Sequence, residues 1–167
     1  RLAAERQRPV SIHCLRAWGR LAELLRAHPR PDCGFLLHSY GGPKEMVEPL
    51  AELGAYFSLP GSFALARKER QRETFRRVPR ERLLLETDAP DQRLPSPEEA
   101  GPAFREAVER RDLPELRDPV SGRLLNHPAS LLGVYLFAAA WFEERVESLA
   151  VQVEANFRRL FGRCCGS

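Results

Sequence analysis

The chain has 167 residues, of which 43% are hydrophobic and 29% are charged. A chain of this length and composition can bury a core of its own, which excludes wholesale disorder. The 26 lysines and arginines against 23 aspartates and glutamates leave a net charge of +3. That surplus is too small to indicate a nucleic-acid partner by itself.

No apolar run approaches the roughly 18–20 residues that a membrane span needs, so no membrane association is expected. The four cysteines show no CxxC pair, and two of them are adjacent at the tail: Cys14, Cys33, Cys164 and Cys165. This usage predicts a reduced, cytoplasmic chain without a structural zinc site. The chain has no initiator Met and opens with a segment that resembles the end of a helix running into a strand, which favours a fragment.

Short apolar strands alternate with helices along the first 90 residues. The expected strands are 9–13, 35–38, 55–59 and 82–87. The expected helices between them are 15–28, stopped by Pro29 and Pro31, then 43–53 with a kink at Pro49, and 63–78. Because the strands are almost continuously apolar, they predict a parallel sheet covered on both faces.

Helices dominate the rest of the chain. We expect a loop over 95–102, a short helix over 104–111 and a turn over 118–122. Asn126 is predicted to cap a helix that has His127 in its first turn and runs through residue 140, and a further helix is predicted over 141–161 after a break. The fold class is α/β.

Chemically active residues stand at the ends of these strands. The first two strands end in His13 and His38, and the fourth ends in Glu86 and Asp88. In parallel α/β folds the active site forms at the carboxyl ends of the strands. Imidazole and carboxylate donors suit Zn²⁺, Mn²⁺ or Fe²⁺, and carboxylate-rich sets admit Mg²⁺. The alternatives are histidines that only hydrogen-bond the scaffold, and a polar loop in which Asp88 caps a helix.

Four strings come in the order and at the separations of a known family. They are PVSIHC (9–14), LHSYGG (37–42), YFSLPG (56–61) and LLLETDAP (83–90). Together they resemble the TatD family of metal-dependent hydrolases and deoxyribonucleases. The later strings NHPA (126–129) and NFRRLFG (156–162) resemble the closing helices of that family, so the resemblance covers nearly the whole chain.

The resemblance implies a TIM (β/α)₈ barrel of the amidohydrolase type, with one or two divalent metal ions, Mg²⁺, Mn²⁺ or Zn²⁺. Carried over to this chain, the metal ligands are His13, His38 and Asp88. Glu86 precedes Asp88 by two residues, so on one strand it would share a face with it and support the attacking water. The substrate would lie against Ser39, Tyr40 and Ser58.

The chain departs from the family at its start. Family members begin with a strand that carries His-x-His, and a later strand carries a metal-bridging Glu; both precede the first string found here. We therefore expect residues 1–167 to be a single TatD-like domain that forms the C-terminal half of the barrel. The absent N-terminal strands, or a partner chain, would then be needed to complete the metal site.

Other polar residues have plainer interpretations. The basic segment 67–77 carries a local charge of +4, and its start could reach the phosphates of a nucleic acid, although a solvated barrel helix is the favoured interpretation. His28 is expected to be an exposed last-turn residue and His127 a helix-start residue near the rim of the site. Cys14 is expected to be a buried small residue rather than a nucleophile.

The first functional hypothesis is a deoxyribonuclease that cleaves DNA phosphodiester bonds with metal-activated water. The second is a catalytically inactive half-barrel that acts only as an interaction piece. A third keeps the hydrolase and changes the substrate to a small carboxylic or phosphate ester, because fold alone does not choose the substrate.

Overall fold

The computed structural model describes residues 1–109 and 116–162, and these residues divide into two compact units. The first, which we call the sheet unit, contains residues 1–59, 73–84 and 151–162. The second, the helical unit, contains residues 60–72 and the described residues of 85–150. Each unit is therefore assembled from separated stretches of the chain.

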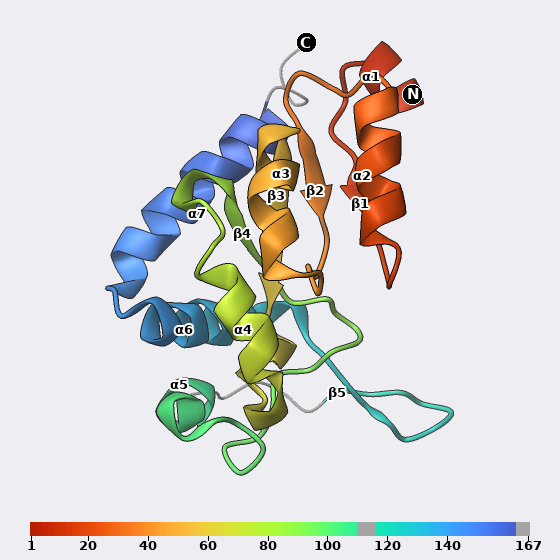
Figure 1. Ribbon diagram of the computed structural model, residues 1–167. Coiled ribbons are helices and arrows are strands. Elements are labelled where there is room, and N and C mark those ends of the chain that lie inside the picture. Colours follow the sequence, from red (N-terminus) through yellow and green to blue (C-terminus); the bar gives the residue numbers. More distant parts are fainter. Residues whose placement is uncertain (110–115, 163–167) are drawn as a thin grey trace. The chain divides into compact units, whose positions relative to one another are not determined.

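Four strands of the described chain form one sheet in the order β1-β2-β3-β4 (Figure 1), and all but the last residues of β3 and β4 belong to the sheet unit. Their bounds are Ser11–Ile12, Phe35–Leu37, Ala55–Pro60 and Leu83–Glu86. The pairs β1–β2 and β2–β3 are parallel, with Ile12 opposite Leu37 and Leu37 opposite Phe57. All four predicted strands are thus confirmed, within two residues at their ends.

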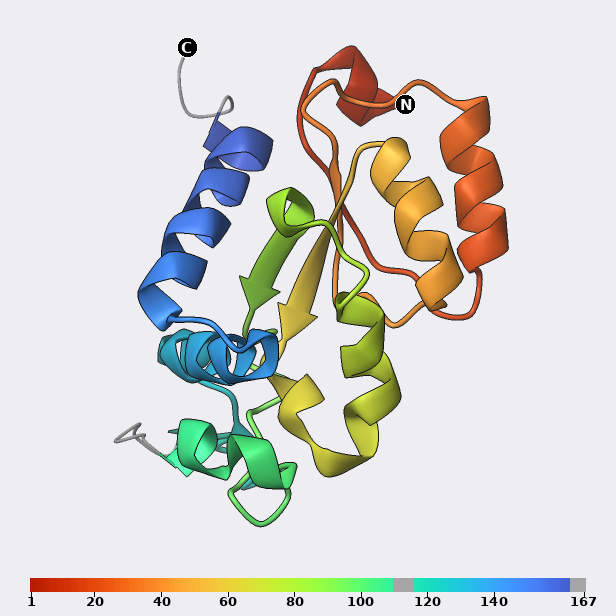
Figure 2. The same cartoon turned by 60° about the vertical axis from the view of Figure 1, so that its left-hand side comes forward.

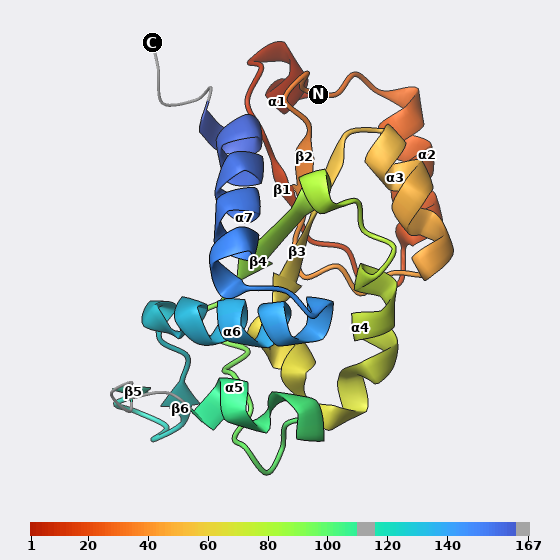
Figure 3. The ribbon, with the colours of Figure 1, turned by 90° about the vertical axis from the view of Figure 1, so that its left-hand side faces the viewer.

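Helices cover both faces of this sheet. Figures 2 and 3 show α2 (Trp18–Ala27) and α3 (Val47–Glu52) on one side of the strands and α7 (Val146–Phe161) on the other. Every residue of β3 is buried as a result. The short α1 (Leu2–Glu5) precedes β1, as the opening of the sequence predicts. The sheet covered on both faces is confirmed.

Two glycines allow the loops directly before β2 and β3 to come into close contact. Gly34 and Gly54 have φ values of +92° and +98°, which side chains with a Cβ rarely adopt. A Cβ on Gly34 would lie 2.4 Å from the carbonyl oxygen of Gly54. The same carbonyl accepts a hydrogen bond of 3.2 Å from the N–H of Phe35, so this close approach places the first residue of β2 beside the start of β3.

Two predicted helices are shorter than expected. The segment 43–53 begins with the 3₁₀ turn η1 (Lys44–Met46), and α3 starts only at Val47. Pro49 therefore lies in the first turn of α3, where it costs no hydrogen bond, and the predicted kink is not needed. The segment 63–78 is divided into η2 (Gly61–Ala64), η3 (Ala66–Lys68) and α4 (Glu69–Phe75), because Leu65 is extended and pairs with Ala100.

The helical unit is built around α6 (Leu131–Phe142), a helix that is apolar on all sides. It packs against η5 (Pro102–Phe104) and α5 (Arg105–Glu109). α5 corresponds to the short helix predicted over 104–111, whose residues 110 and 111 lie outside the described residues. The ring of Phe104 meets those of Phe137 and Trp141 at centroid distances of 4.9 and 6.0 Å. Glu143 then ends α6 in the left-handed conformation, which is the predicted break before α7.

A small hairpin is an element that the sequence did not indicate. The predicted turn over 118–122 joins the antiparallel strands β5 (Leu116–Arg117) and β6 (Leu124–Leu125). Strands of two residues are too short to show an alternating pattern.

The predicted cap of the next helix was wrong. His127, not Asn126, is the N-cap of η6 (Pro128–Ser130), and its Nδ1 accepts a hydrogen bond of 3.0 Å from the N–H of Ala129.

Candidate metal site and its loops

Two of the predicted ligands, His13 and His38, lie side by side in the sheet unit. Each directly follows the last residue of its strand, and those last residues, Ile12 and Leu37, are opposite one another in the parallel register. The N–H of His38 also donates a hydrogen bond of 3.0 Å to the carbonyl of Ile12. The ring centroids are 5.6 Å apart and the rings are tilted by 42°. The parallel register therefore produces the pairing that the sequence predicted.

This imidazole pair fits a divalent cation. With metal–nitrogen distances of ~2.0–2.1 Å, two imidazoles on one tetrahedral ion have ring centroids roughly 5 Å apart. The observed separation of 5.6 Å is close to that value. His13 is exposed and His38 is half-buried, so one side of the pair is open to solvent. Among the described residues of either unit, no three His, Cys, Asp or Glu side chains are gathered closely enough to hold a metal.

Ser39 and Ser58 join the ends of β2 and β3. Ser39 has a φ of +47°, and its N–H donates a hydrogen bond of 3.2 Å to the hydroxyl oxygen of Ser58. Ser58 is only 1% exposed. Its hydroxyl therefore fixes the backbone beside His38, and Ser39, which is half-buried, is the member of the pair nearer to solvent.

Tyr40 has a packing role in this structure. The side chain is fully buried, with its ring against Trp18 at 4.6 Å and Phe57 at 5.1 Å between centroids. Its hydroxyl donates a hydrogen bond of 2.8 Å to the carbonyl of Pro43. Burial raises the pKa of Tyr40 well above its ordinary value of 10, so the phenol remains a donor. The predicted substrate contact of Tyr40 is not supported, because nothing of its side chain reaches the surface.

Glu86 and Asp88 belong to the helical unit. Glu86 is the last residue of β4, and Asp88 follows in a loop with a φ of +59°. Strand alternation ends at Glu86, so the prediction that Glu86 and Asp88 share one face of a strand was wrong. Aspartate tolerates the left-handed region better than most residues, which makes this loop conformation accessible. The Asp88 carboxylate accepts a hydrogen bond from the side-chain amide of Gln92.

Asn126 fixes the loop that carries Asp88. Its side chain is 3% exposed, and its Nδ2 donates hydrogen bonds to the carbonyls of Thr87, at 2.6 Å, and Gln92, at 3.4 Å. Its backbone N–H donates to the carbonyl of Pro90 at 2.8 Å. A single buried residue therefore holds the loop at three points, two through its side-chain amide and one through its backbone N–H. Sequence reasoning identified Asn126 only as a helix cap, because contacts 34–39 residues away leave no local pattern.

The basic segment 67–77 contains a residue that cannot contact nucleic acid. Arg72 is 5% exposed, and its Nη1 donates hydrogen bonds to the carbonyls of Phe63, at 2.6 Å, and Leu65, at 2.7 Å. Its guanidinium stacks over the rings of Phe104 and Trp141 at 5.0 and 5.7 Å. Arg72 is therefore a buried cation of the helical unit, and the interpretation of the whole segment as a solvated helix is wrong at this position.

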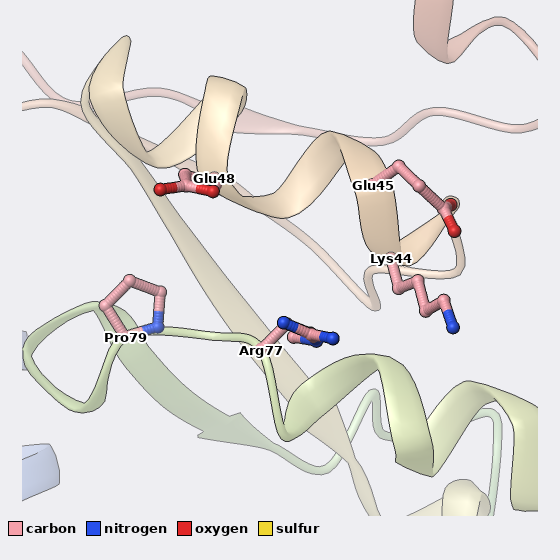
Figure 4. Close-up of a pocket in the computed structure, with 5 residues that line it drawn as sticks. All are labelled: Lys44, Glu45, Glu48, Arg77 and Pro79. Atoms are coloured by element: carbon pink, nitrogen blue, oxygen red, sulfur yellow. The ribbon is translucent and has the colours of Figure 1, made fainter.

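A charged cleft of about 450 Å³ lies elsewhere in the sheet unit (Figure 4). It is lined by Lys44, Glu45, Glu48, Arg77 and Pro79. Figure 4 shows these side chains between η1 and α3 on one side and the segment after α4 on the other. Because both cations and carboxylates line the cleft, it does not favour one sign of ligand charge.

Other sequence expectations can be checked directly. Cys14 is half-buried and, like Cys33, is a free thiol, while Cys164 and Cys165 lie outside the described residues. His28 ends α2 and is exposed, as predicted. Within residues 1–109 and 116–162, no helix is long and apolar enough to cross a membrane.

A parallel α/β sheet with paired imidazoles after neighbouring strands defines the class: an α/β protein with a candidate metal site at the strand ends. Comparison with known proteins agrees. The family model described as TatD related DNase matches residues 1–162. The chain belongs to this family.

Curated relatives support the assignment over almost the whole chain. The chain is 33% identical over 162 residues to a protein of Klebsiella pneumoniae (strain 342) named 3'-5' ssDNA/RNA exonuclease TatD, covering 96% of this chain and 54% of that protein. It is 31% identical over 141 residues to the uncharacterized metal-dependent hydrolase YjjV of Escherichia coli (strain K12), covering 80% and 53%. The chain thus spans about half the length of the curated relatives it matches.

Solved structures show the same fold. The crystal structure of YjjV, a TatD homolog from Escherichia coli K12, superposes with a TM-score of 0.71 at 24% identity, over 96% of this chain and 52% of that one. A TatD family hydrolase from Entamoeba histolytica gives a TM-score of 0.77 at 17% identity, over 96% and 53%. The α/β fold of this chain is therefore that of TatD proteins.

Proposed function

We propose that this chain carries part of the active site of a metal-dependent hydrolase that cleaves phosphodiester bonds in nucleic acid. The observation that carries the proposal is the His13–His38 pair at the ends of adjacent parallel strands, in a chain of the TatD family. Half-length coverage of the relatives supports the further proposal that β1–β4 are consecutive strands in one half of a (β/α)₈ barrel.

In this proposal His13, His38 and Asp88 hold the divalent cation, Mg²⁺, Mn²⁺ or Zn²⁺, in a site of one or two ions. A bound cation supplies a water of lowered pKa and polarises the phosphoryl oxygen. Glu86 orients the attacking water and accepts its proton, and the backbone at Ser39, fixed by Ser58, borders the substrate. Further ligands come from a part of the barrel outside residues 1–167, or from a partner chain.

The proposed substrate is single-stranded DNA, attacked from its 3' end. Several relatives are named 3'-5' ssDNA/RNA exonuclease, which supports this choice and makes RNA the second polymer to test. The exposed cations at the start of the basic segment, Arg67 and Arg70, are the candidate phosphate contacts, because phosphate recognition depends on accessible Arg and Lys. The buried Arg72 is excluded from that role.

The proposal is tested by following Mn²⁺-dependent release of nucleotides from a 3'-labelled single-stranded oligonucleotide. We expect His13→Ala and Asp88→Ala to lower turnover about 100-fold or more, since each removes a ligand. His28→Ala, an exposed histidine at the end of α2, is the matched control and should retain activity. Retained turnover in Asp88→Ala refutes the ligand assignment.

Two alternatives give distinct results in the same assay. If the wild-type chain binds no metal and cleaves neither polymer even when the part that supplies the further ligands is present, it is an inactive half-barrel that acts as an interaction piece. If it cleaves p-nitrophenyl phosphate or p-nitrophenyl acetate but neither DNA nor RNA, it is a metal-dependent hydrolase of small esters.

A further inference from the structure

The loop after β4 is held in an uncommon backbone conformation. Asp88 and Gln92, four residues apart, have φ values of +59° and +47°. Residues other than glycine seldom occupy this left-handed region, and those that do concentrate at functional sites. The N–H of Asp91 donates a hydrogen bond of 2.9 Å to the carbonyl of Asp88, which closes the turn between them.

The side-chain amide of Gln92 is engaged at both ends. Its Oε1 accepts a hydrogen bond of 2.7 Å from the hydroxyl of Ser62, and its Nε2 donates to Oδ2 of Asp88. Ser62 is 7% exposed and lies in η2, directly after β3. Because the carboxylate of Asp88 can only accept, the amide of Gln92 presents its NH₂ group to Asp88, and its Oε1 then accepts from the Ser62 hydroxyl.

The backbone of Gln92 is fixed as well. Its carbonyl accepts a hydrogen bond from Nδ2 of the buried Asn126, whose other Nδ2 bond goes to the carbonyl of Thr87. Residues on both sides of Asp88 are thereby tied to one buried side chain. Gln92 itself is exposed, so the hydrogen bonds of its amide are not a by-product of core packing.

We propose that Gln92, held by Ser62, is the positioning residue of Asp88 and directs its carboxylate for cation binding. The inference rests on the proposed function, in which Asp88 is a metal ligand. A neutral donor fixes the carboxylate without cancelling its charge, which is how residues behind a metal ligand commonly raise metal affinity.

The test measures the Kd of Mn²⁺ by calorimetry for the purified protein in which this chain is accompanied by the part that supplies the further ligands, together with the melting temperature of each variant. Gln92→Met keeps the length of the side chain and removes the donor. We expect the Mn²⁺ Kd to rise about tenfold, the lower end of the 10–100-fold range for such supporting residues, with an unchanged melting temperature. Ser62→Ala should raise the Kd by a smaller factor.

Gln7→Met is a closely matched control. Gln7 also has a left-handed backbone, with a φ of +49°, and its amide is also engaged at both ends, with Ala4 and Asp32. It belongs to the sheet unit and has no bond to Asp88, so the Kd should stay within twofold of the wild-type value.

A measurement without metal tests the hydrogen bonds of the Gln92 side chain. In ¹⁵N–¹H spectra, Asp88→Asn and Ser62→Ala should each shift the side-chain amide signals of Gln92 and leave those of Gln7 in place. If neither variant shifts them, the hydrogen bonds are absent in solution and the inference is overturned.

The failures of the two proposals are distinguishable. If Asp88→Asn weakens Mn²⁺ binding and Gln92→Met does not, Gln92 has no positioning role and Asp88 remains a ligand. If Asp88→Asn leaves the Kd unchanged, or the wild-type chain binds no Mn²⁺, the ligand role of Asp88 is overturned together with the role of Gln92.

Discussion

The sequence predicted that Tyr40 contacts the substrate, whereas in the structure its side chain is buried in the core. The substitution Tyr40→Phe removes only the hydrogen bond to Pro43, so we expect a loss of about 0.5–1.5 kcal/mol in the free energy of unfolding. Urea unfolding measures this loss. Affinity for the oligonucleotide should not change, and a loss of affinity at unchanged stability would restore the substrate role of Tyr40.

The same variant gives a pH dependence. Because burial raises the pKa of Tyr40 in the folded state, the unfolded chain releases the phenolic proton first, near its ordinary value of 10. The contribution of Tyr40 to stability is therefore complete below pH 10 and is lost as the pH rises above it. Unfolding measured at pH 9 and pH 11 should show a steeper loss for the wild-type chain than for Tyr40→Phe.

The charge of Arg72 lies against two aromatic rings of the helical unit. In Arg72→Met the carbonyls of Phe63 and Leu65 lose the guanidinium as a donor, and we expect a loss of about 2–4 kcal/mol. Arg72→Lys should recover only part of it, since lysine cannot stack a planar guanidinium on Phe104. The exposed Arg67→Met is the control; an equal loss in both variants, by urea unfolding, contradicts the structural role of Arg72.

At the scale of elements, the loop after β4 depends on Asn126. Asn126→Ala removes both Nδ2 bonds and should destabilise the helical unit by about 1–3 kcal/mol. Asn126→Asp should cost more, because a carboxylate would then face the carbonyl of Thr87. Hydrogen exchange at the N–H of Asp91 reports the loop itself, and unchanged protection in both variants would mean that the loop does not need Asn126.

The sequence predicts an element more accurately where nearby residues determine it than where distant contacts do. The strands and the ends of α2 follow from apolar runs and from Pro29 and Pro31, and they were found within a few residues. The pairing of His13 with His38 was also predictable, because equal positions after parallel strands meet at one edge. The motif strings predicted the family.

What the sequence could not predict depends on distant contacts. The extended Leu65, which divides a predicted helix, is set by its pairing with Ala100. The burial of Tyr40 and Arg72 is set by the rings around them, and the left-handed turn at Asp88 by hydrogen bonds from Gln92 and Asn126. None of these partners leaves a periodic signal.

At the scale of the molecule, the chain passes repeatedly between the two units. The sheet unit is completed by α7, where the buried Asn156 donates hydrogen bonds of 2.7 Å to the carbonyls of both Arg80 and Leu83. These bonds connect α7 to the start of β4 across more than seventy residues of sequence. The sheet unit is thus not a contiguous domain.

A variant of α7 tests this dependence. Asn156→Leu removes the side-chain donor from the carbonyls of Arg80 and Leu83, although the carbonyl of Arg80 keeps the N–H of Leu83 as a donor. We expect a loss of about 1–3 kcal/mol with faster hydrogen exchange in β4. Gln152→Leu, one turn earlier in α7, removes only a bond to Asn156 and should have a much smaller effect. Unaltered exchange in β4 would show that α7 does not secure the strand.

The interleaved course of the chain also sets an order of events on the ribosome. Residues 1–59 leave the ribosome while the roughly ninety residues before the last part of the sheet unit have still to be made. At synthesis rates of ~5–20 residues per second, the nascent sheet waits about 5–20 s for its final helix. During that time one apolar face of the sheet lacks its cover, so the nascent chain should be a substrate for chaperones that bind exposed hydrophobic segments.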